Sequence, residues 1–374
     1  MTDTAVCTVI AKNYLAFARV LADSLRQHHP ELPLYVVSVD PPDGRFDPGA
    51  EPFGLLDLGL SARRRFIFPR QRLVVSSKAL ALEALLDRGH STALFLDADM
   101  LVLDRLDPLL EAPGEVVLTP HLLQPADTAR ELNILVSGVF NGGVLRVSGS
   151  PEGRAFLDDW GSRLDTHCRW DPAGGLHWDQ RWLDLAAARH SCVEVLRDPG
   201  INVAYWALPE RREEHLRLFH FSGFEPWHSE RATKYPATAE RTPLFDHYAD
   251  LLSRAGVEQT VGFPYSWDRF DNGVPIPAVA RGLFEGRQGD PVGQGDPVGQ
   301  GDPFATGPGS YFGWLRSPVD PGEPVVTQLW HALWASRPDL REGYPDPLGE
   351  DRKAFVEWTR RTETDHDVDP AFVV

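Results

Sequence analysis

The sequence predicts an α/β fold with a mostly parallel sheet and a separate second part, on three observations. Strand-like apolar runs alternate with helical segments from Val6 to Pro120, which is the pattern of βαβ units and a parallel sheet. Strand-like runs become sparse in the second half, where Trp, Pro and Arg are frequent. The length of 374 residues suits two domains, or one large domain with an appendage.

The predicted elements follow from local patterns. Phe17, Val20, Leu21 and Leu25 share one helical face, Gly89 closes a second helix, and "PPDG" ends a strand as a turn. In order, the elements are a strand at Val6–Ala11, a helix at Ala16–His29, a strand at Leu32–Val39, a helix at Lys78–Gly89, and strands at Thr92–Asp99 and Gly114–Pro120.

The second part is predicted to be mostly helical. We place a boundary near residue 255, giving domains at 1–255 and 256–374, and amphipathic helices are expected within 325–340 and 350–361. The segment "GDPVGQGDPVGQGDPF" repeats six residues, but a solenoid needs at least about three stacked repeats. We therefore interpret 286–304 as a flexible loop of duplicated sequence.

Composition excludes several partners. A formal charge of −17 disfavours nucleic acid and anionic membranes, although a small anionic ligand could still bind in a local positive pocket or through a metal. Three cysteines without a paired spacing favour a reduced, cytoplasmic protein. We find no signal peptide in the first residues and no apolar run of the roughly 20 residues that a membrane helix needs.

Two aspartates, Asp97 and Asp99, interrupt an apolar strand at its end. Strand positions two apart point the same way, so the two carboxylates can converge beyond the carboxyl end of the strand, where α/β sheets bind ligands. They repel one another unless they share a proton or hold a cation. Carboxylate oxygens suit Mg²⁺ or Mn²⁺, and the alternative is a solvated strand end with a turn-forming Asp.

The segment "LFLDADMLVL" resembles the Asp-x-Asp segment of nucleotide-sugar glycosyltransferases with the GT-A fold, and its surroundings resemble family 8 of these enzymes. "IAKNYLAFARVLADSL", "FNGGVLRV", "HWDQRWLDLA" and "LFHFSGFEPW" are similar to four further family segments in the same order. Within family 8, the residues of these segments resemble most a bacterial subgroup that carries a C-terminal extension. The resemblance covers about residues 5–228 and implies a Rossmann-like mixed sheet with helices on both faces.

The resemblance also implies roles for individual residues. His220 would complete a metal site with Asp97 and Asp99, holding Mn²⁺ or Mg²⁺. Asp179 and Gln180 would lie at the reacting carbon. The implied donor-binding residues are Ala11, Asn13 and Tyr14 at the base, Lys78, Asp97, Ala98, Asn141, Gly142, Gly143 and Gly223.

Each of these positions has a plainer interpretation. His220 could be a hydrogen-bonded core histidine, Lys78 a solvent-facing lysine, and Asn141–Gly142 a hairpin turn. Asp179 could cap the helix that follows it. His121 could face an acceptor or lie in a loop, and the tryptophans Trp178, Trp206 and Trp227 could be packing residues rather than sugar platforms.

Two positions depart from the family pattern. Glu225 stands where a lysine contacts the donor diphosphate, and Arg231 or Lys234 could take that role instead. Lys12 stands where an acidic residue often helps read the base, which puts a preference for uracil in doubt.

The sequence therefore predicts a metal-dependent glycosyltransferase that moves a sugar from a nucleotide-sugar donor, a UDP-sugar in the first place, to a glycan or small-molecule acceptor. The resemblance implies retention at the anomeric carbon; if the reaction inverts, Asp179 is the nearest candidate base. The alternatives are a catalytically silent nucleotide-sugar-binding protein and a sugar nucleotidyltransferase. For the C-terminal part, covering the acceptor site, self-association and docking a partner enzyme all stay open.

Overall fold

The computed structural model describes residues 3–41, 53–55, 58–208, 211, 216–224, 242–286, 301–361 and 368–373. The chain forms two compact units. The first comprises Met1–Gly59 and Arg70–Tyr265, and the second comprises Leu60–Pro69 and Ser266–Val374. The boundary near residue 255 stays a prediction, and the inclusion of Leu60–Pro69 in the second unit has no signal in the sequence analysis.

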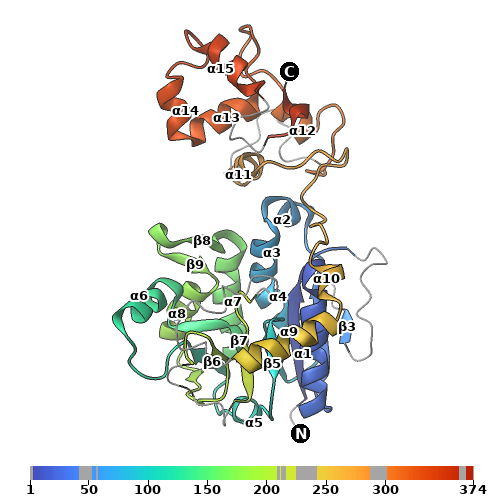
Figure 1. Ribbon diagram of the computed structural model, residues 1–374, viewed down its shortest axis with the longest axis vertical. Helices are drawn as coiled ribbons and strands as arrows, with labels where there is room; N and C mark the ends of the chain where they lie inside the picture. The colour runs from blue at the N-terminus through green and yellow to red at the C-terminus, as the bar shows by residue number, and fades with distance from the viewer. Residues whose placement is uncertain are drawn as a thin grey trace. The chain divides into compact units, whose positions relative to one another are not determined.

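The first unit is organised around a seven-stranded mixed sheet (Figure 1). Strand β7 runs antiparallel to β4 and β6, and the other neighbouring pairs are parallel. In spatial order the strands are β10 (Val193–Val195), β6 (Val116–Pro120), β7 (Phe140–Ser148), β4 (Thr92–Leu96), β1 (Thr4–Ile10), β2 (Leu34–Ser38) and β3 (Phe53–Leu55).

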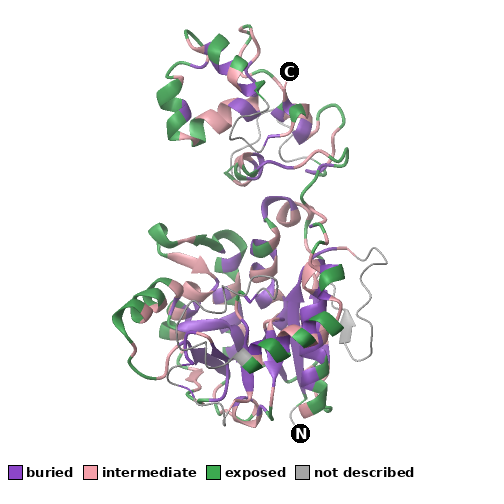
Figure 2. Ribbon diagram, in the orientation of Figure 1, coloured by how far each residue is buried: buried purple, intermediate pink, exposed green. Residues whose placement is uncertain are grey.

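Helices cover both faces of this sheet. Val6 of β1 is aligned with Leu34 and Leu94 on its two neighbours, and these side chains pack with Leu21 and Leu25 of α1 (Leu15–His28). Every residue of β1 is buried, as Figure 2 shows in purple, so the opposite face is covered too. Helix α4 (Lys78–Asp87) packs against β1 and β4, and α7 (Pro151–His167) and α8 (Gln180–Arg189) pack against β7.

Two smaller sheets complete the first unit. The three-stranded sheet joins β5 (Met100–Val102) antiparallel to β12 (Leu218–His220), which lies parallel to β11 (Val203–Ala204). The two-stranded sheet pairs β8 (Arg169–Asp171) with β9 (Leu176–Trp178). The remaining helices of the unit are η1 (Lys12–Tyr14), α3 (Arg70–Ser76), α5 (Asp107–Leu110), α6 (Thr128–Ser137), η2 (Pro172–Gly174), α9 (Thr242–Arg254) and α10 (Val257–Thr260).

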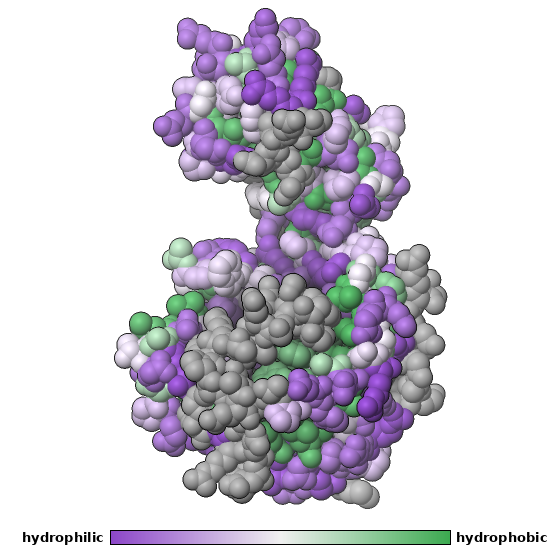
Figure 3. All heavy atoms as spheres, in the orientation of Figure 1, coloured by the Kyte–Doolittle hydropathy of each residue, from purple (hydrophilic) through white to green (hydrophobic). Residues whose placement is uncertain are grey.

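Helix α6 is unusual because none of its residues is buried. In the part of the chain that the structure describes, the exposed large hydrophobic residues gather on and near this helix: Leu132, Leu135, Val136, Val139, Trp170 and Leu185. Figure 3 shows hydrophobic atoms at the surface over α6. At its carboxyl end, the Ser137 carbonyl accepts a hydrogen bond from Gln180 Nε2 at 3.0 Å, which ties the helix to α8.

The second unit is helical, with an aromatic core. Phe66 has no exposed surface and contacts the rings of Phe270, Phe284, Phe304 and Tyr311. Apolar rings of this size bury enough surface to hold short helices together. The helices are α2 (Ala62–Ile67), α11 (Ala278–Gly286), α12 (Tyr311–Leu315), α13 (Gln328–Ser336), α14 (Pro338–Gly343), α15 (Arg352–Thr359) and η7 (Pro370–Phe372).

The predicted fold class, a mostly parallel mixed α/β sheet plus a mainly helical C-terminal part, is confirmed. The predicted strand Thr92–Asp99 is too long, because β4 ends at Leu96 and Asp97–Asp99 forms a turn before β5. Most of the predicted loop at 286–304 lies outside the described residues. Within the described chain, no helix combines the length and the apolar character that spanning a bilayer requires.

Candidate functional site

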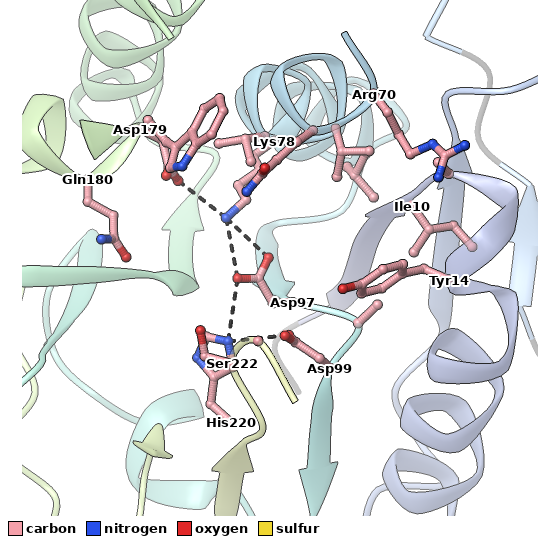
Figure 4. Close-up of a pocket in the computed structure, with 18 of the residues that line it drawn as sticks. Ile10, Tyr14, Arg70, Lys78, Asp97, Asp99, Asp179, Gln180, His220 and Ser222 are labelled. Carbon is pink, nitrogen blue, oxygen red and sulfur yellow. Dashed lines mark hydrogen bonds and ion pairs between the residues drawn. The ribbon is translucent and has the colours of Figure 1, made fainter. Parts of the chain in front are cut away.

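A cavity of about 490 Å³ opens beyond the carboxyl ends of β1 and β4 (Figure 4). This is the edge at which α/β sheets bind ligands. Of the residues that the sequence predicts for the site, those lining the cavity are Ala11, Asn13, Tyr14, Lys78, Asp97, Ala98, Asp99, Asn141, Asp179, Gln180, His220 and Gly223. Gly142 and Gly143 lie beside it on β7, where their carbonyls accept hydrogen bonds from Lys78 Nζ and Asp97 N.

Strand pairing brings the two aspartates to His220. The Asp97 N–H donates to the Gly143 carbonyl at 2.9 Å, which holds the start of the turn. Strand β12 then pairs with β5 so that His220 lies opposite Met100, the residue after Asp99. This arrangement needs a long-range antiparallel pairing, because β5 ends at Val102 and β12 begins only at Leu218.

The three side chains form a compact donor set. One ligand atom from each of Asp97, Asp99 and His220 lies within 4.8 Å of the others. The His220 Nε2 atom is 3.3 Å from Asp99 Oδ1 and 3.8 Å from Asp97 Oδ2. Two carboxylate oxygens and one imidazole nitrogen are a donor set that Mn²⁺ accepts. The residues present therefore fit a divalent cation.

The electrostatics of the cluster suit a bound cation. Burial raises the pKa of Asp97 above its ordinary value, and the nearby Asp99 adds to this against the opposing effect of Lys78. Burial also acts to raise the pKa of Asp99, but the adjacent His220 lowers it below its ordinary value. The pKa of His220 is raised because the two carboxylates outweigh burial. A divalent ion would relieve the repulsion between the carboxylates.

Lys78 begins α4 with its side chain almost completely buried, so the solvent-facing alternative is wrong. Its Nζ atom contacts the Gly142 carbonyl at 2.9 Å. It also lies 3.1 Å from Asp97 Oδ1 and 3.3 Å from Asp179 Oδ2, as the dashed lines in Figure 4 mark. The two carboxylates raise the pKa of Lys78 despite its burial. The contacts with the Gly142 carbonyl and, at 3.4 Å, with Asp97 Oδ2 are hydrogen bonds, whereas the contact with Asp179 Oδ2 is an ion pair. A donor contact by Lys78 stays a prediction.

Asp179 and Gln180 line the cavity beside Lys78 and Gly142. Asp179 stands at the N-cap position of α8 but makes no capping bond; its carboxylate lies against Lys78 instead. Gln180 Oε1 accepts from the Gly142 N–H at 3.1 Å. The preceding Trp178 also lines the cavity and has a φ of 50°, a left-handed conformation that is rare for a bulky residue.

Asn141, Gly142 and Gly143 lie within strand β7, so the hairpin-turn alternative is wrong here. The two glycines allow close packing under the cavity. A Cβ atom added to Gly142 would collide with the Asp179 carboxylate, and one added to Gly143 would lie 2.7 Å from Asn141 Oδ1 and from His220 Cε1. Real Cβ atoms do not approach other atoms so closely, so larger residues would displace the site.

We expect Gly143→Ala to weaken Mn²⁺ binding, because the new methyl group pushes His220 away from the aspartates. The crowding should also lower the free energy of unfolding by about 1–3 kcal/mol. Titration calorimetry with Mn²⁺ and thermal unfolding measure the two effects. Gly149→Ala is the matched control, since a Cβ there has its nearest neighbour at 3.5 Å. Equal Mn²⁺ affinity in both variants would contradict the steric argument.

The other end of the cavity is lined by Ala11, Asn13 and Tyr14. Within the described chain, the buried Asn13 Oδ1 atom has no hydrogen-bond partner, and a buried acceptor of this kind normally has one. The Tyr14 ring stacks on Phe17 with centroids 4.5 Å apart. Lys12 is buried and is not one of the lining residues.

The sequence analysis missed part of the cavity wall. Arg70, Gln71, Val74 and Val75 of α3 line it, as do His177 and Ser222. Arg70 lies beside the Tyr265 ring, at 5.7 Å from its centroid, and no pattern around "FIFPRQRLVV" marks it as a site residue. The described residues do not include Glu225, Pro226, Trp227, Arg231 and Lys234. The predicted loss of a diphosphate contact at Glu225, and its replacement by Arg231 or Lys234, therefore stay predictions.

His121 is buried, and its two ring nitrogens contact the Val139 carbonyl and Asn141 Nδ2. Its exposed fraction is 4%, and its ring packs against Trp206 with centroids 5.2 Å apart. Burial lowers the pKa of His121 to about 3. Trp206 also packs against the His220 ring, so it is a packing residue, whereas Trp178 lines the cavity.

Comparison with known proteins gives distant likenesses. No protein-family model matches the chain. The uncharacterized protein YfnF of Bacillus subtilis (strain 168) is 22% identical over 221 residues, which cover 54% of this chain and 72% of YfnF.

Among solved structures, the galactosyltransferase LgtC in complex with donor and acceptor sugar analogs is similar, with a TM-score of 0.48 and 17% identity over 70% of this chain and 98% of LgtC. The bifunctional glycosyltransferase WbbM is similar with a TM-score of 0.43 and 14% identity over 66% of this chain and 51% of WbbM. Likenesses this distant carry no activity over to this chain.

Proposed function

We propose that this protein is a metal-dependent glycosyltransferase that transfers a sugar from a nucleotide-sugar donor to a glycan or small-molecule acceptor. The observation that carries the proposal is the position of the donor set Asp97, Asp99 and His220 in the wall of a cavity of about 490 Å³. That volume lies in the range of small-molecule sites. The cavity also has polar groups at both ends, as a nucleotide joined to a sugar requires.

In this proposal the donor lies along the cavity. Its base contacts Ala11, Asn13 and Tyr14, where the Asn13 Oδ1 atom accepts a hydrogen bond from a base N–H. Asp97, Asp99 and His220 hold Mn²⁺ or Mg²⁺ beside the diphosphate. A divalent cation there supplies positive charge to the phosphates and stabilises the nucleotide as it leaves. A UDP-sugar is the donor that we propose first.

The sugar would lie toward Asp179 and Gln180. Both amide ends of Gln180 are held, by the Gly142 N–H and by the Ser137 carbonyl, so its orientation is fixed before substrate binds. Asp179 Oδ2 has Lys78 as its ionic partner at 3.3 Å. We propose retention at the anomeric carbon, for which the departing phosphate can take the acceptor's proton and no protein base is required.

Thermal unfolding with a panel of nucleotide sugars tests the proposal. At a ligand concentration of about 100 Kd, binding adds roughly 2.7 kcal/mol of stability, so the right donor should raise Tm clearly, and only with Mn²⁺ or Mg²⁺ present. The same mixture should slowly release free nucleotide. Stabilisation without release would favour the silent binding protein, and no stabilisation by any nucleotide sugar would refute the proposal.

A further inference from the structure

His220 of the proposed metal site is also the last of a row of four buried polar side chains. The row consists of His121, Asn141, Asn202 and His220. Their exposed fractions are between 1% and 4%. Each contacts the next, through Asn141 Nδ2 and His121 Nε2 at 3.1 Å, Asn202 Nδ2 and Asn141 Oδ1 at 3.1 Å, and Asn202 Oδ1 and His220 Nδ1 at 3.2 Å. Such rows have a direction, because every contact needs one donor and one acceptor.

Two backbone groups fix the direction at Asn141 and His121. The Gly143 N–H can only donate, and it lies 2.9 Å from Asn141 Oδ1, so this atom is the oxygen. The Asn141 amide nitrogen therefore faces His121 Nε2, which accepts. The other ring nitrogen, His121 Nδ1, lies 3.4 Å from the Val139 carbonyl, which can only accept. Both ends require the same neutral tautomer of His121.

The same assignment of donors and acceptors extends through Asn202 to His220. Because Asn141 Oδ1 accepts, Asn202 must present its amide nitrogen, which also donates to Thr119 Oγ1 at 2.7 Å. The amide oxygen of Asn202 is left for His220 Nδ1. An oxygen at that position needs a donor, so Nδ1 carries the hydrogen. In the neutral ring, the lone pair is then on Nε2, the atom that faces Asp97 and Asp99.

The backbone at Asn202 supports a dedicated role. Its φ is 53°, in the left-handed region. Asn is among the few residues other than Gly that adopt this conformation readily. Asn202 thus reaches its three partners from a conformation that most residues would resist.

We propose that Asn202 is a positioning residue for the metal centre: it holds His220 in the Nδ1–H tautomer and in the orientation that presents Nε2 to the ion. The inference rests on the proposed metal site. Metal-binding histidines commonly donate their second ring N–H to a neighbouring acceptor, and loss of that acceptor typically costs roughly 10–100-fold in metal affinity or activity. The residues behind Asn202 extend this support to the backbone of β7.

The test uses Mn²⁺ alone, without a nucleotide sugar. We expect Asn202→Ala to weaken Mn²⁺ binding by roughly 10–100-fold in titration calorimetry. Thr119→Val is the matched control, because it removes a buried hydrogen bond of Asn202 but leaves the contact to His220. It should lower Tm while changing Mn²⁺ affinity little. Unchanged affinity in Asn202→Ala, or equal loss in both variants, would overturn the inference.

A second readout needs no metal. In ¹⁵N NMR of the metal-free protein above the pKa of His220, the ring should show hydrogen on Nδ1, and Asn202→Ala should shift it toward Nε2. The signal is assigned by its loss in His220→Gln, since the chain has 13 histidines. Hydrogen on Nε2 in the wild type would refute the tautomer assignment. Failure of the glycosyltransferase proposal is separate, because it would appear as Mn²⁺ binding without any effect of nucleotide sugars.

Discussion

Replacing Asp97 or Asp99 by Asn should reduce sugar transfer to background. Asn keeps the shape of the side chain but removes its negative charge, and neutral amides are weak ligands for a hard cation beside phosphates. A metal that stabilises departing charge contributes several kcal/mol, and about 4 kcal/mol corresponds to roughly a thousandfold in rate. Binding of Mn²⁺ together with the nucleotide sugar should weaken in parallel, because both carboxylates belong to the donor set.

Titration calorimetry with Mn²⁺ and the donor found in the thermal screen measures this effect, and nucleotide release measures activity. Asp87→Asn is the matched control, since Asp87 is an exposed carboxylate at the end of α4 that pairs with Arg154. It should leave both quantities unchanged. Donor and metal affinities at the wild-type level in both Asp97→Asn and Asp99→Asn would refute the metal assignment.

The sequence predicted the parts of the site that local patterns encode. Asp97 and Asp99 stand out because two charges follow a buried apolar run, and the carboxyl end of such a strand is where α/β sheets bind ligands. Strand periodicity does not place them, because Asp97–Asp99 forms a turn. The sheet itself follows from alternating strands and helices. His220 could be joined to them only through a family resemblance, because its position depends on the pairing of β12 with β5, and such long-range pairing has no local signal.

The sequence could not predict how side chains share their hydrogen bonds. A donor contact by Lys78 stays a prediction, but nothing in the sequence indicates that its ammonium also contacts Gly142, Asp97 and Asp179. Asn202 has no signal in the sequence, since a single Asn says nothing about its neighbours in space. The same holds for Leu60–Pro69, which packs with the C-terminal unit through Phe66.

Replacing Lys78 by Met should strongly destabilise the first unit. Met has similar length and keeps the apolar contacts of the lysine stem, but the buried Asp179 carboxylate, whose side chain is 4% exposed, loses its positive partner at 3.3 Å. Asp97 loses the same partner at 3.1 Å. Breaking a buried ion pair by removing one partner typically costs about 3–5 kcal/mol, which is a fall in Tm on the order of 10 °C for a domain of this size.

Thermal unfolding with and without Mn²⁺ separates two roles of Lys78. If its main role is to neutralise the carboxylates, Lys78→Met should lose stability, and Mn²⁺ should raise its Tm by restoring positive charge beside Asp97. If its main role is a donor contact, Lys78→Met should keep its stability and lose only affinity for the nucleotide sugar. Lys353→Met, at an exposed position on α15, controls for the substitution and should stay within about 0.5 kcal/mol of the wild type. The position of the buried Lys78 ammonium, within 3.3 Å of two carboxylates, favours the first result, because removing it leaves both negative charges without their positive partner.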